Sequence, residues 1–165
     1  MAHSSSSRGI AAARAAACAL GVMAVLSPVA QAVDFRSTAD SATVLYDAPS
    51  TKAKPLFILG RDTPLEVIVV VEGWVKVRDA GGTIAWAEKR ALADKRSLVV
   101  RAQVAEVRAG PDDSAPLVFR AEQNVLLEPA EPLTGAAATE APGWVKVKHR
   151  DGQVGYVRIA RIFGL

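Results

Sequence analysis

The sequence predicts an all-β protein made of two small β-barrels in tandem, preceded by a separate N-terminal segment. One observation is an internal repeat, because Gly73-Trp-Val-Lys-Val77 recurs as Gly143-Trp-Val-Lys-Val147 at an offset of 70. Another is a series of short β-branched runs separated by turn signals. A third is the poor helix signal after residue 32. Together they predict two copies of a β module of about 60 residues.

Composition excludes several classes of protein. The 165 residues are 50% hydrophobic and 22% charged, which excludes a disordered chain. One cysteine and two histidines exclude a disulfide framework and a multi-ligand Cys/His zinc site, so no metal and no cofactor is expected. The formal net charge of +3 is too small an excess to indicate nucleic-acid binding.

Residues 1–32 have the order of charged, apolar and small residues that is typical of a secretory signal peptide. Arg8 and Arg14 precede an uncharged run over residues 15–26, and Ala30-Gln-Ala32 predicts cleavage after Ala32. The run is shorter than the ~20 residues of a transmembrane helix, so no integral membrane span is expected after cleavage. The alternative is an uncleaved anchor. The predicted location is periplasmic or secreted.

The first barrel is predicted over residues 33–94. Leu65-Glu-Val-Ile-Val-Val-Val71 is an apolar run of strand length, and Trp74-Val-Lys-Val-Arg78 alternates, with both valines on one face. Asp79-Ala-Gly-Gly82 predicts a hairpin loop, after which Thr83-Ile-Ala-Trp-Ala87 returns as a strand. Residues 88–96 predict one helical turn between the two barrels.

The second barrel is predicted over residues 95–165. Its hairpin carries Asp151-Gly152, a strong hairpin signal because both residues tolerate positive φ. A segment rich in Ala, Pro, Thr and Gly near residues 131–141 predicts an inserted loop.

The two copies resemble the bacterial SH3-like (SH3b) domain, a small β-barrel. The second copy has its three marks in order: Val107-Arg-Ala-Gly-Pro111, then the hydrophobic strand Val125-Leu-Leu127, then Gly143-Trp-Val-Lys-Val147 with a D-G hairpin and Gly155-Tyr-Val157. The first copy departs, with Leu45-Tyr-Asp-Ala-Pro49 and Ala85-Trp-Ala87 at the corresponding places. The resemblance implies a secreted or periplasmic binding protein without a catalytic domain.

Catalytic constellations are not predicted. After cleavage the chain has no cysteine, and its one histidine, His149, falls on a hairpin tip. The neighbours Asp112 and Asp113 follow a proline, where turn chemistry explains them. We therefore expect a protein that is not an enzyme.

Aromatic side chains are the best candidates for a binding surface. Trp74 and Trp144 begin the same strand in each copy, opposite the valine face; the alternative is that each packs over the end of its barrel. The residues expected to join them or to share their face are Tyr46, Trp86, Tyr156, Arg108, Lys76 and Lys146.

Two functions fit these observations. The first is a non-enzymatic periplasmic module that recognises cell-wall peptide or glycan through its aromatic residues. The second is an envelope adaptor or scaffold that binds another protein through the surface of its barrels. An open aromatic groove would favour the first function, and a closed groove beside an exposed apolar patch would favour the second.

Overall fold

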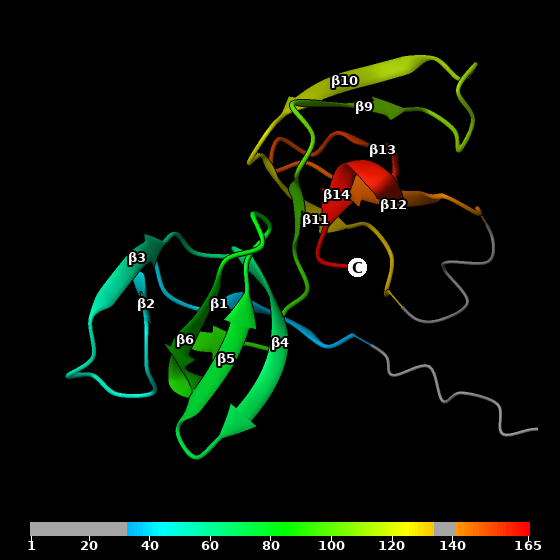
Figure 1. The fold of residues 1–165 in the computed structure, drawn as a ribbon. Coiled ribbons are helices and arrows are strands. Elements are labelled where there is room, and N and C mark those ends of the chain that lie inside the picture. The colour runs from blue at the N-terminus through cyan, green and yellow to red at the C-terminus, as the bar shows by residue number, and fades with distance from the viewer. Residues whose placement is uncertain (1–32, 134–140) are drawn as a thin grey trace, which may run out of the picture. The chain divides into compact units, whose positions relative to one another are not determined.

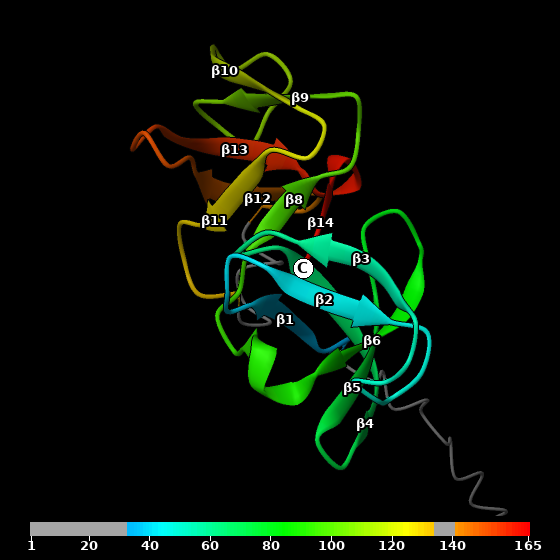
Figure 2. The same cartoon turned by 90° about the vertical axis from the view of Figure 1, so that its left-hand side faces the viewer.

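The computed structural model describes residues 33–133 and 141–165. The predicted signal peptide lies outside the described residues, as does most of the predicted insertion near 131–141. Within the described ranges the fold is all-β, with two successive small barrels (Figures 1 and 2). No helix in these ranges is long and apolar enough to cross a membrane.

The first barrel is a seven-stranded sheet with the strand order β3-β2-β6-β5-β4-β1-β7. Its strands are β1 (Phe35–Thr38), β2 (Thr43–Tyr46), β3 (Pro55–Leu59), β4 (Pro64–Val71), β5 (Trp74–Arg78), β6 (Ile84–Glu88) and β7 (Leu92–Ala93). A single turn of 3-10 helix, η1 (Lys89–Ala91), lies between β6 and β7. The helical turn predicted within residues 88–96 is therefore present, and it is followed by a strand of the same barrel.

The second barrel repeats this topology strand for strand, in the order β10-β9-β13-β12-β11-β8-β14. Its strands are β8 (Leu98–Val100), β9 (Val104–Arg108), β10 (Leu117–Glu122), β11 (Leu126–Pro129), β12 (Trp144–Lys148), β13 (Val154–Arg158) and β14 (Ile162–Phe163), with η2 (Ile159–Arg161) before β14. Each strand of the second barrel has a number seven higher than that of the corresponding strand in the first, so that β8 corresponds to β1 and β14 to β7. The repeat seen in the sequence is thus a repeat of the whole fold.

Alternation along the strands builds a separate core for each barrel. Val75 and Val77 of β5 are fully buried, as the valine face predicted, and Leu45, Leu65 and Leu92 join them from β2, β4 and β7. Because the inward faces of these strands meet in one cluster, the sheet curls around its own core. In the second barrel the core is formed in the same way by Leu98, Val100, Ala105, Val107, Ala121, Leu127, Val147, Val157 and Ile162.

The segment between the barrels is packed and hydrogen-bonded. The described residues, 33–133 and 141–165, belong to one compact unit. Ser97 is 2% exposed, and its hydroxyl donates to the carbonyl of Asp62 at 2.6 Å. The Ser37 Oγ lies 2.5 Å from the same Ser97 Oγ, and it is the donor there because the Ser97 proton is already used. Phe35 and Phe163 meet edge to face, with 5.1 Å between ring centroids.

Candidate functional site

The same turn places a tryptophan at the same point of each barrel. Gly73 and Gly143 both have a left-handed backbone, with φ of 74° and 81°, which glycine adopts without strain. The carbonyl of Gly73 accepts a hydrogen bond from the Lys89 amide at 2.9 Å, and the carbonyl of Gly143 accepts one from the Ile159 amide at 3.0 Å. The tryptophan that follows each glycine is therefore held in an equivalent place.

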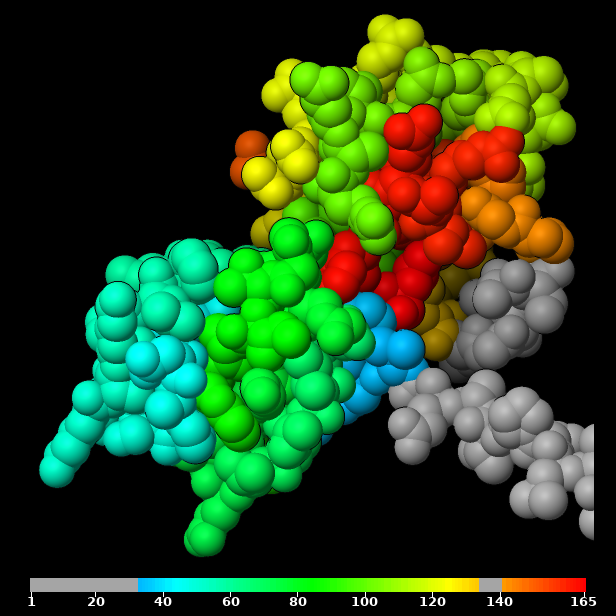
Figure 3. All heavy atoms as spheres, in the orientation of Figure 1, coloured from blue at the N-terminus to red at the C-terminus, as the bar shows by residue number. Residues whose placement is uncertain are grey.

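Trp74 lies beside an open hollow of about 680 Å³ in the first barrel. In Figure 3 the surface is hollowed between the loop after β2 (cyan) and the β4–β5 turn (green). Tyr46 packs edge to face against Trp74, with centroids 5.5 Å apart, and so fixes the indole. The residues that line the hollow are Pro49, Ser50, Thr51, Gly73, Trp74, Glu88, Lys89 and Arg90.

Glu88 is the cross-strand partner of Trp74 and supplies a carboxylate beside the indole. Arg90 donates to this carboxylate from Nε at 2.7 Å, although the Arg90 side chain is 83% exposed. The Glu88 carboxylate raises the pKa of Arg90 through this hydrogen bond. An ion pair as exposed as this one contributes little to stability, and each group can exchange easily to another partner.

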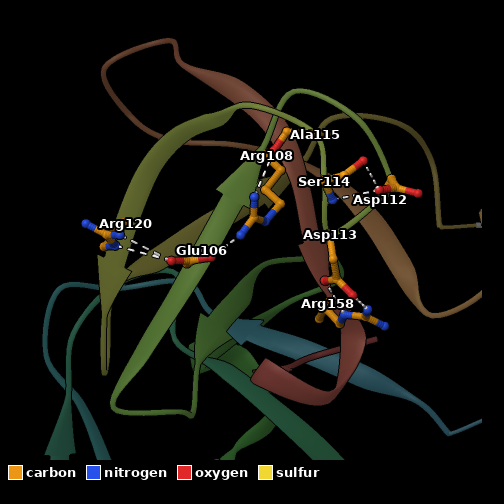
Figure 4. A network of polar contacts seen from close by, with 8 residues as sticks. All are labelled: Glu106, Arg108, Asp112, Asp113, Ser114, Ala115, Arg120 and Arg158. Atoms are coloured by element: carbon orange, nitrogen blue, oxygen red, sulfur yellow. Dashed lines mark hydrogen bonds and ion pairs between the residues drawn. The ribbon is translucent and has the colours of Figure 1, made fainter.

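Trp144 of the second barrel is closed off. It is 5% exposed, and the guanidinium carbon of Arg158 lies 4.7 Å from its ring centroid. Arg158 is held there by Asp113, through Nε to Oδ1 at 3.2 Å and through a second contact of Nη2 with Oδ2 (Figure 4). Arg158 thus covers the Trp144 ring, which borders two hollows of about 180 and 320 Å³, whereas Trp74 borders the hollow of about 680 Å³.

Arg108, which stands where the first barrel has Tyr46, is tied into its own barrel (Figure 4). It donates to the carbonyl of Ala115 at 2.8 Å and also contacts Glu106. Glu106 accepts from Arg120 as well, at 3.3 Å. Hydrogen bonds from Arg108 and then Arg120 hold the pKa of Glu106 below its ordinary value.

Lys76 and Lys146 occupy matching positions over a second pair of aromatic rings. The Lys76 Nζ lies 5.7 Å from the ring centroid of Trp86, and the Lys146 Nζ lies 5.9 Å from that of Tyr156. Lys146 also pairs with Glu131 at 2.8 Å, which raises its pKa. Both lysines therefore have an aromatic neighbour within cation–π range.

The predicted candidates thus separate into two sets. Tyr46 and Trp74 meet at the hollow of the first barrel, and Trp86 lies beside them as the partner of Tyr46 and Lys76. Trp144 and Arg108 lie in the polar network of the second barrel. Within the described residues, no group of three or more His, Cys, Asp or Glu side chains could hold a metal ion.

Sequence reasoning missed three charged residues next to the tryptophans: Glu88, Arg158 and Asp113. A signal for the first two was present, because Glu88 and Arg158 are themselves 70 residues apart and so align in the repeat. Asp113 was assigned to turn chemistry. Its neighbour Asp112 does have that role, since it accepts from the amide and hydroxyl of Ser114, both at 2.6 Å.

The His149 ring was expected on a solvated hairpin tip. It lies on the turn between β12 and β13, but it packs against Phe119 with 5.6 Å between centroids, and its side chain is 23% exposed. Its Nδ1 lies 2.9 Å from the Asp151 carboxylate. The turn position was predicted correctly, whereas the packing against Phe119 was not.

Comparison with known proteins identifies the family. The bacterial SH3 domain family matches residues 39–94 and 101–164, which together are more than half of the chain. The protein therefore belongs to the bacterial SH3 domain family and contains two such domains in tandem. Domains of this family are generally binding modules, often for cell-wall components, and are typically non-catalytic.

Solved structures that match this chain include NlpC2 and NlpC1 from Trichomonas vaginalis. NlpC2 is 14% identical, with a TM-score of 0.33, over 78% of this chain and 46% of that protein. NlpC1 is 15% identical, also with a TM-score of 0.33, over 87% of this chain and 50% of that protein. The chain thus spans half or less of the length of these two proteins. No curated protein matches the sequence.

Proposed function

We propose that this protein is a non-enzymatic periplasmic binding module that recognises cell-wall peptide or glycan through the aromatic hollow of its first barrel. The observation that carries the proposal is the open hollow of about 680 Å³ at Trp74, which is lined by hydroxyl, carboxylate and basic side chains. Such a site offers a stacking face together with hydrogen-bonding groups, as peptide and sugar ligands require.

The corresponding position of the second barrel is less open, so we place ligand binding in the first barrel. Its corresponding tryptophan is covered by Arg158. The two hollows that Trp144 borders are smaller, at about 180 Å³ beside Lys146 and Tyr156 and about 320 Å³ beside Arg108 and Arg158. We therefore assign ligand binding to Trp74 and Tyr46, with Trp86 and Lys76 at the border of the site. Trp144, Tyr156, Arg108 and Lys146 are secondary candidates.

Sedimentation with purified peptidoglycan tests the proposal. Residues 33–165 should co-sediment with it, and Trp74→Leu should weaken binding about tenfold or more, as the loss of a central aromatic contact does in other interfaces. Ile84→Ala is the matched control, because this residue is 47% exposed on the next strand and does not line the hollow. Equal binding by the wild type and Trp74→Leu would place the site elsewhere.

An envelope adaptor that binds another protein is the second candidate function. One observation favours it: the first barrel exposes large apolar side chains, with Ile58 at 71%, Val70 at 49% and Phe57 at 45%. Large apolar side chains that are exposed in this way are available to a protein partner. If peptidoglycan does not sediment the wild type, in-cell crosslinking from position 58 should capture an envelope protein.

The proposed location depends on the N-terminal segment. We propose that residues 1–32 direct export and that the exported protein begins at Val33. N-terminal sequencing of the protein recovered from the periplasm or the medium tests this directly. Recovery of Met1 at the N-terminus of a membrane-associated form would support the anchor instead.

A further inference from the structure

The structure contains its own comparison for the Trp74 site, because the repeated tryptophan occurs in two states. Trp144 carries the guanidinium of Arg158 at 4.7 Å from its ring centroid. Trp86 likewise has the amine of Lys76 over its ring. In the part of the chain that the structure describes, Trp74 is the tryptophan without a cation over its ring. Trp74 also borders the hollow of about 680 Å³, whereas the hollows that Trp144 borders measure about 180 and 320 Å³.

A charge reversal in the repeat accounts for this difference. Glu88 pairs with Trp74 across β5 and β6, and Arg158 pairs with Trp144 across β12 and β13. The first barrel therefore has a carboxylate where the second has a guanidinium. The loop residue changes as well, since Asp113, which holds Arg158, aligns with Thr51 on the wall of the hollow.

The site at Trp144 shows which kind of chemical group can bind at this position of the fold. In the second barrel, a cation lies on the indole face and a carboxylate holds it there. In the first barrel the indole and the carboxylate are both present, as Trp74 and Glu88, but the cation is not supplied by the same strand. An aromatic face beside a carboxylate attracts ammonium and guanidinium groups.

From this comparison we infer that the hollow of the first barrel binds a cationic group of its ligand, an ammonium or a guanidinium, stacked on Trp74 and paired with Glu88. The inference rests on the proposed function and names the ligand chemistry of that site. Arg158 occupies the corresponding place of the second barrel from within. The second barrel is therefore a self-occupied copy of the site.

Arg90 acts as an internal competitor for this ligand. It holds the Glu88 carboxylate at 2.7 Å, while its side chain remains 83% exposed. A ligand cation that pairs with Glu88 must displace Arg90, and the cost of doing so is small because the pair is exposed. Removal of the Arg90 charge should therefore strengthen the binding of a cation. If the site served an anion instead, the same change would weaken binding, because Lys89 and Arg90 also line the hollow.

Two matched amide probes test the cation directly. Nα-acetyl-lysine N-methylamide carries the amine, and its Nε-acetyl derivative has the same stem without the charge. Titration of residues 33–165, followed by the NMR signal of the Trp74 indole N–H, should give about tenfold tighter binding for the amine, since a cation–π contact and an ion pair are gained together. Equal affinity for both probes would overturn the inference.

Three variants locate the effect. Glu88→Gln should weaken the amine probe about threefold, and Arg90→Gln should strengthen it about twofold to threefold, both within the range of an exposed ion pair. The double variant Thr51→Asp/Glu88→Arg introduces into the first barrel the residue types of Asp113 and Arg158 of the second. It should abolish binding of the amine probe. An unchanged affinity in Glu88→Gln, or weaker binding in Arg90→Gln, would contradict the inference. Circular dichroism verifies that each variant is folded.

Two further experiments distinguish a peptide amine from a sugar amine, and distinguish failure of the cation inference from failure of the proposed function. Glucosamine and N-acetylglucosamine repeat the charged and neutral comparison for a sugar, so preference for the lysine probe over glucosamine assigns the site to a peptide amine. Peptidoglycan whose amines have been acetylated should sediment the protein less than untreated material. Equal sedimentation with both would overturn the cation inference and leave the proposed function standing, whereas sedimentation by neither would overturn the proposed function.

Discussion

Gly155 of β13 faces the backbone of β9 at very close range. A Cβ built on Gly155 would lie 2.6 Å from the Arg108 carbonyl oxygen and 2.7 Å from Val107 Cγ1. The aligned residue of the first barrel is Ala85, which is buried and carries its methyl group without difficulty. The motif therefore differs between the barrels because the two strands approach each other more closely in the second.

We expect Gly155→Ala to destabilise the second barrel, because the backbone of β9 must move to admit the methyl group. The free energy of unfolding should fall by about 1–3 kcal/mol, as for other overpacked sites. Urea unfolding measures the change. Gly60→Ala is the control, since a Cβ there meets nothing within 4 Å, and it should alter stability by about 0.5 kcal/mol or less. Equal effects from the two variants would contradict this account.

Asp113→Ala should uncover Trp144, because Asp113 is the carboxylate that holds Arg158 over the indole. In a protein whose other tryptophans are changed to phenylalanine, acrylamide should quench the Trp144 fluorescence more strongly in the variant than in its parent. Stability should fall by about 1 kcal/mol or less, since both side chains are partly exposed. Unchanged quenching would show that Arg158 stays in place without its partner.

The position of both tryptophans was predictable from the sequence, whereas their different environments were not. Alternation with Val75 and Val77 correctly placed Trp74 on the outer face. The cover of Trp144 depends on Arg158 from the adjacent strand and on Asp113, which lies 45 residues earlier in the chain. Local patterns carry no information about such a contact. Comparison of the two copies at the positions of Glu88 and Arg158 would have shown the reversal.

At the scale of elements, the edge strands β3 and β10 of the two barrels differ in charge. β3 and β10 each end the order of their sheet, so one side of each strand has no partner in its own sheet. β3 has the sequence PLFIL, without a charge, whereas β10 carries Arg120 and Glu122. Charged residues on an edge strand oppose pairing with other chains. The edge of the first barrel lacks this protection.

Transfer of the charges from β10 to β3 should reduce self-association. Val44 and Ile58 are cross-strand partners, and they correspond to the partners Glu106 and Arg120 of the second barrel. Light scattering of concentrated protein should fall in Val44→Glu/Ile58→Arg, while the free energy of unfolding stays within about 1 kcal/mol, because Ile58 is exposed and Val44 is only half-buried. Val154→Glu, on the surface of the second barrel, controls for the replacement of an exposed apolar side chain by a charged one at another place. If both proteins scatter alike, the β3 edge is not the associating surface.

The longer strands were predictable, and the shortest were not. The predicted segments 65–71, 74–78 and 83–87 match β4, β5 and β6 to within one residue. The two-residue strands β7 and β14 are too short to show a period. They form because Leu92 and Ile162 are buried in the two cores. The boundary between the barrels at residues 94 and 95 stays a prediction.

At the scale of the whole molecule, the two barrels differ in their acidic groups. Among the described residues, the carboxylates whose pKa is clearly lowered all belong to the second barrel. Arg108 and Arg120 lower the pKa of Glu106, hydrogen bonds from Ser114 lower that of Asp112, and the Gln153 amide followed by His149 lowers that of Asp151. The folded second barrel thus favours the charged form of each group.

Acid should therefore weaken the second barrel more than the first. A carboxylate whose pKa is lowered in the folded state stabilises the fold at pH values above its ordinary pKa. The ordinary pKa is 4.5 for Glu106 and 3.8 for Asp112 and Asp151. This stabilisation decreases as the pH falls below the ordinary pKa of each group, and it is lost once the pH has fallen through the lowered pKa of the folded state. Urea unfolding can be followed by the fluorescence of Trp144 for the second barrel and of Trp74 for the first. When the pH is lowered from about 6 to about 3, the midpoint urea concentration should fall more for Trp144 than for Trp74.

Two variants test whether the lowered carboxylates cause this difference. Asp112→Asn removes one of these groups, so the loss of stability between about pH 6 and pH 3 should be smaller in this variant than in the wild type. Asp40→Asn, on an exposed turn of the first barrel, should leave the loss unchanged. If Asp112→Asn and Asp40→Asn have the same pH dependence, the acid sensitivity has another source. The charge network around Asp113 and Arg158 would then be the next group to examine, because its loss would also uncover Trp144.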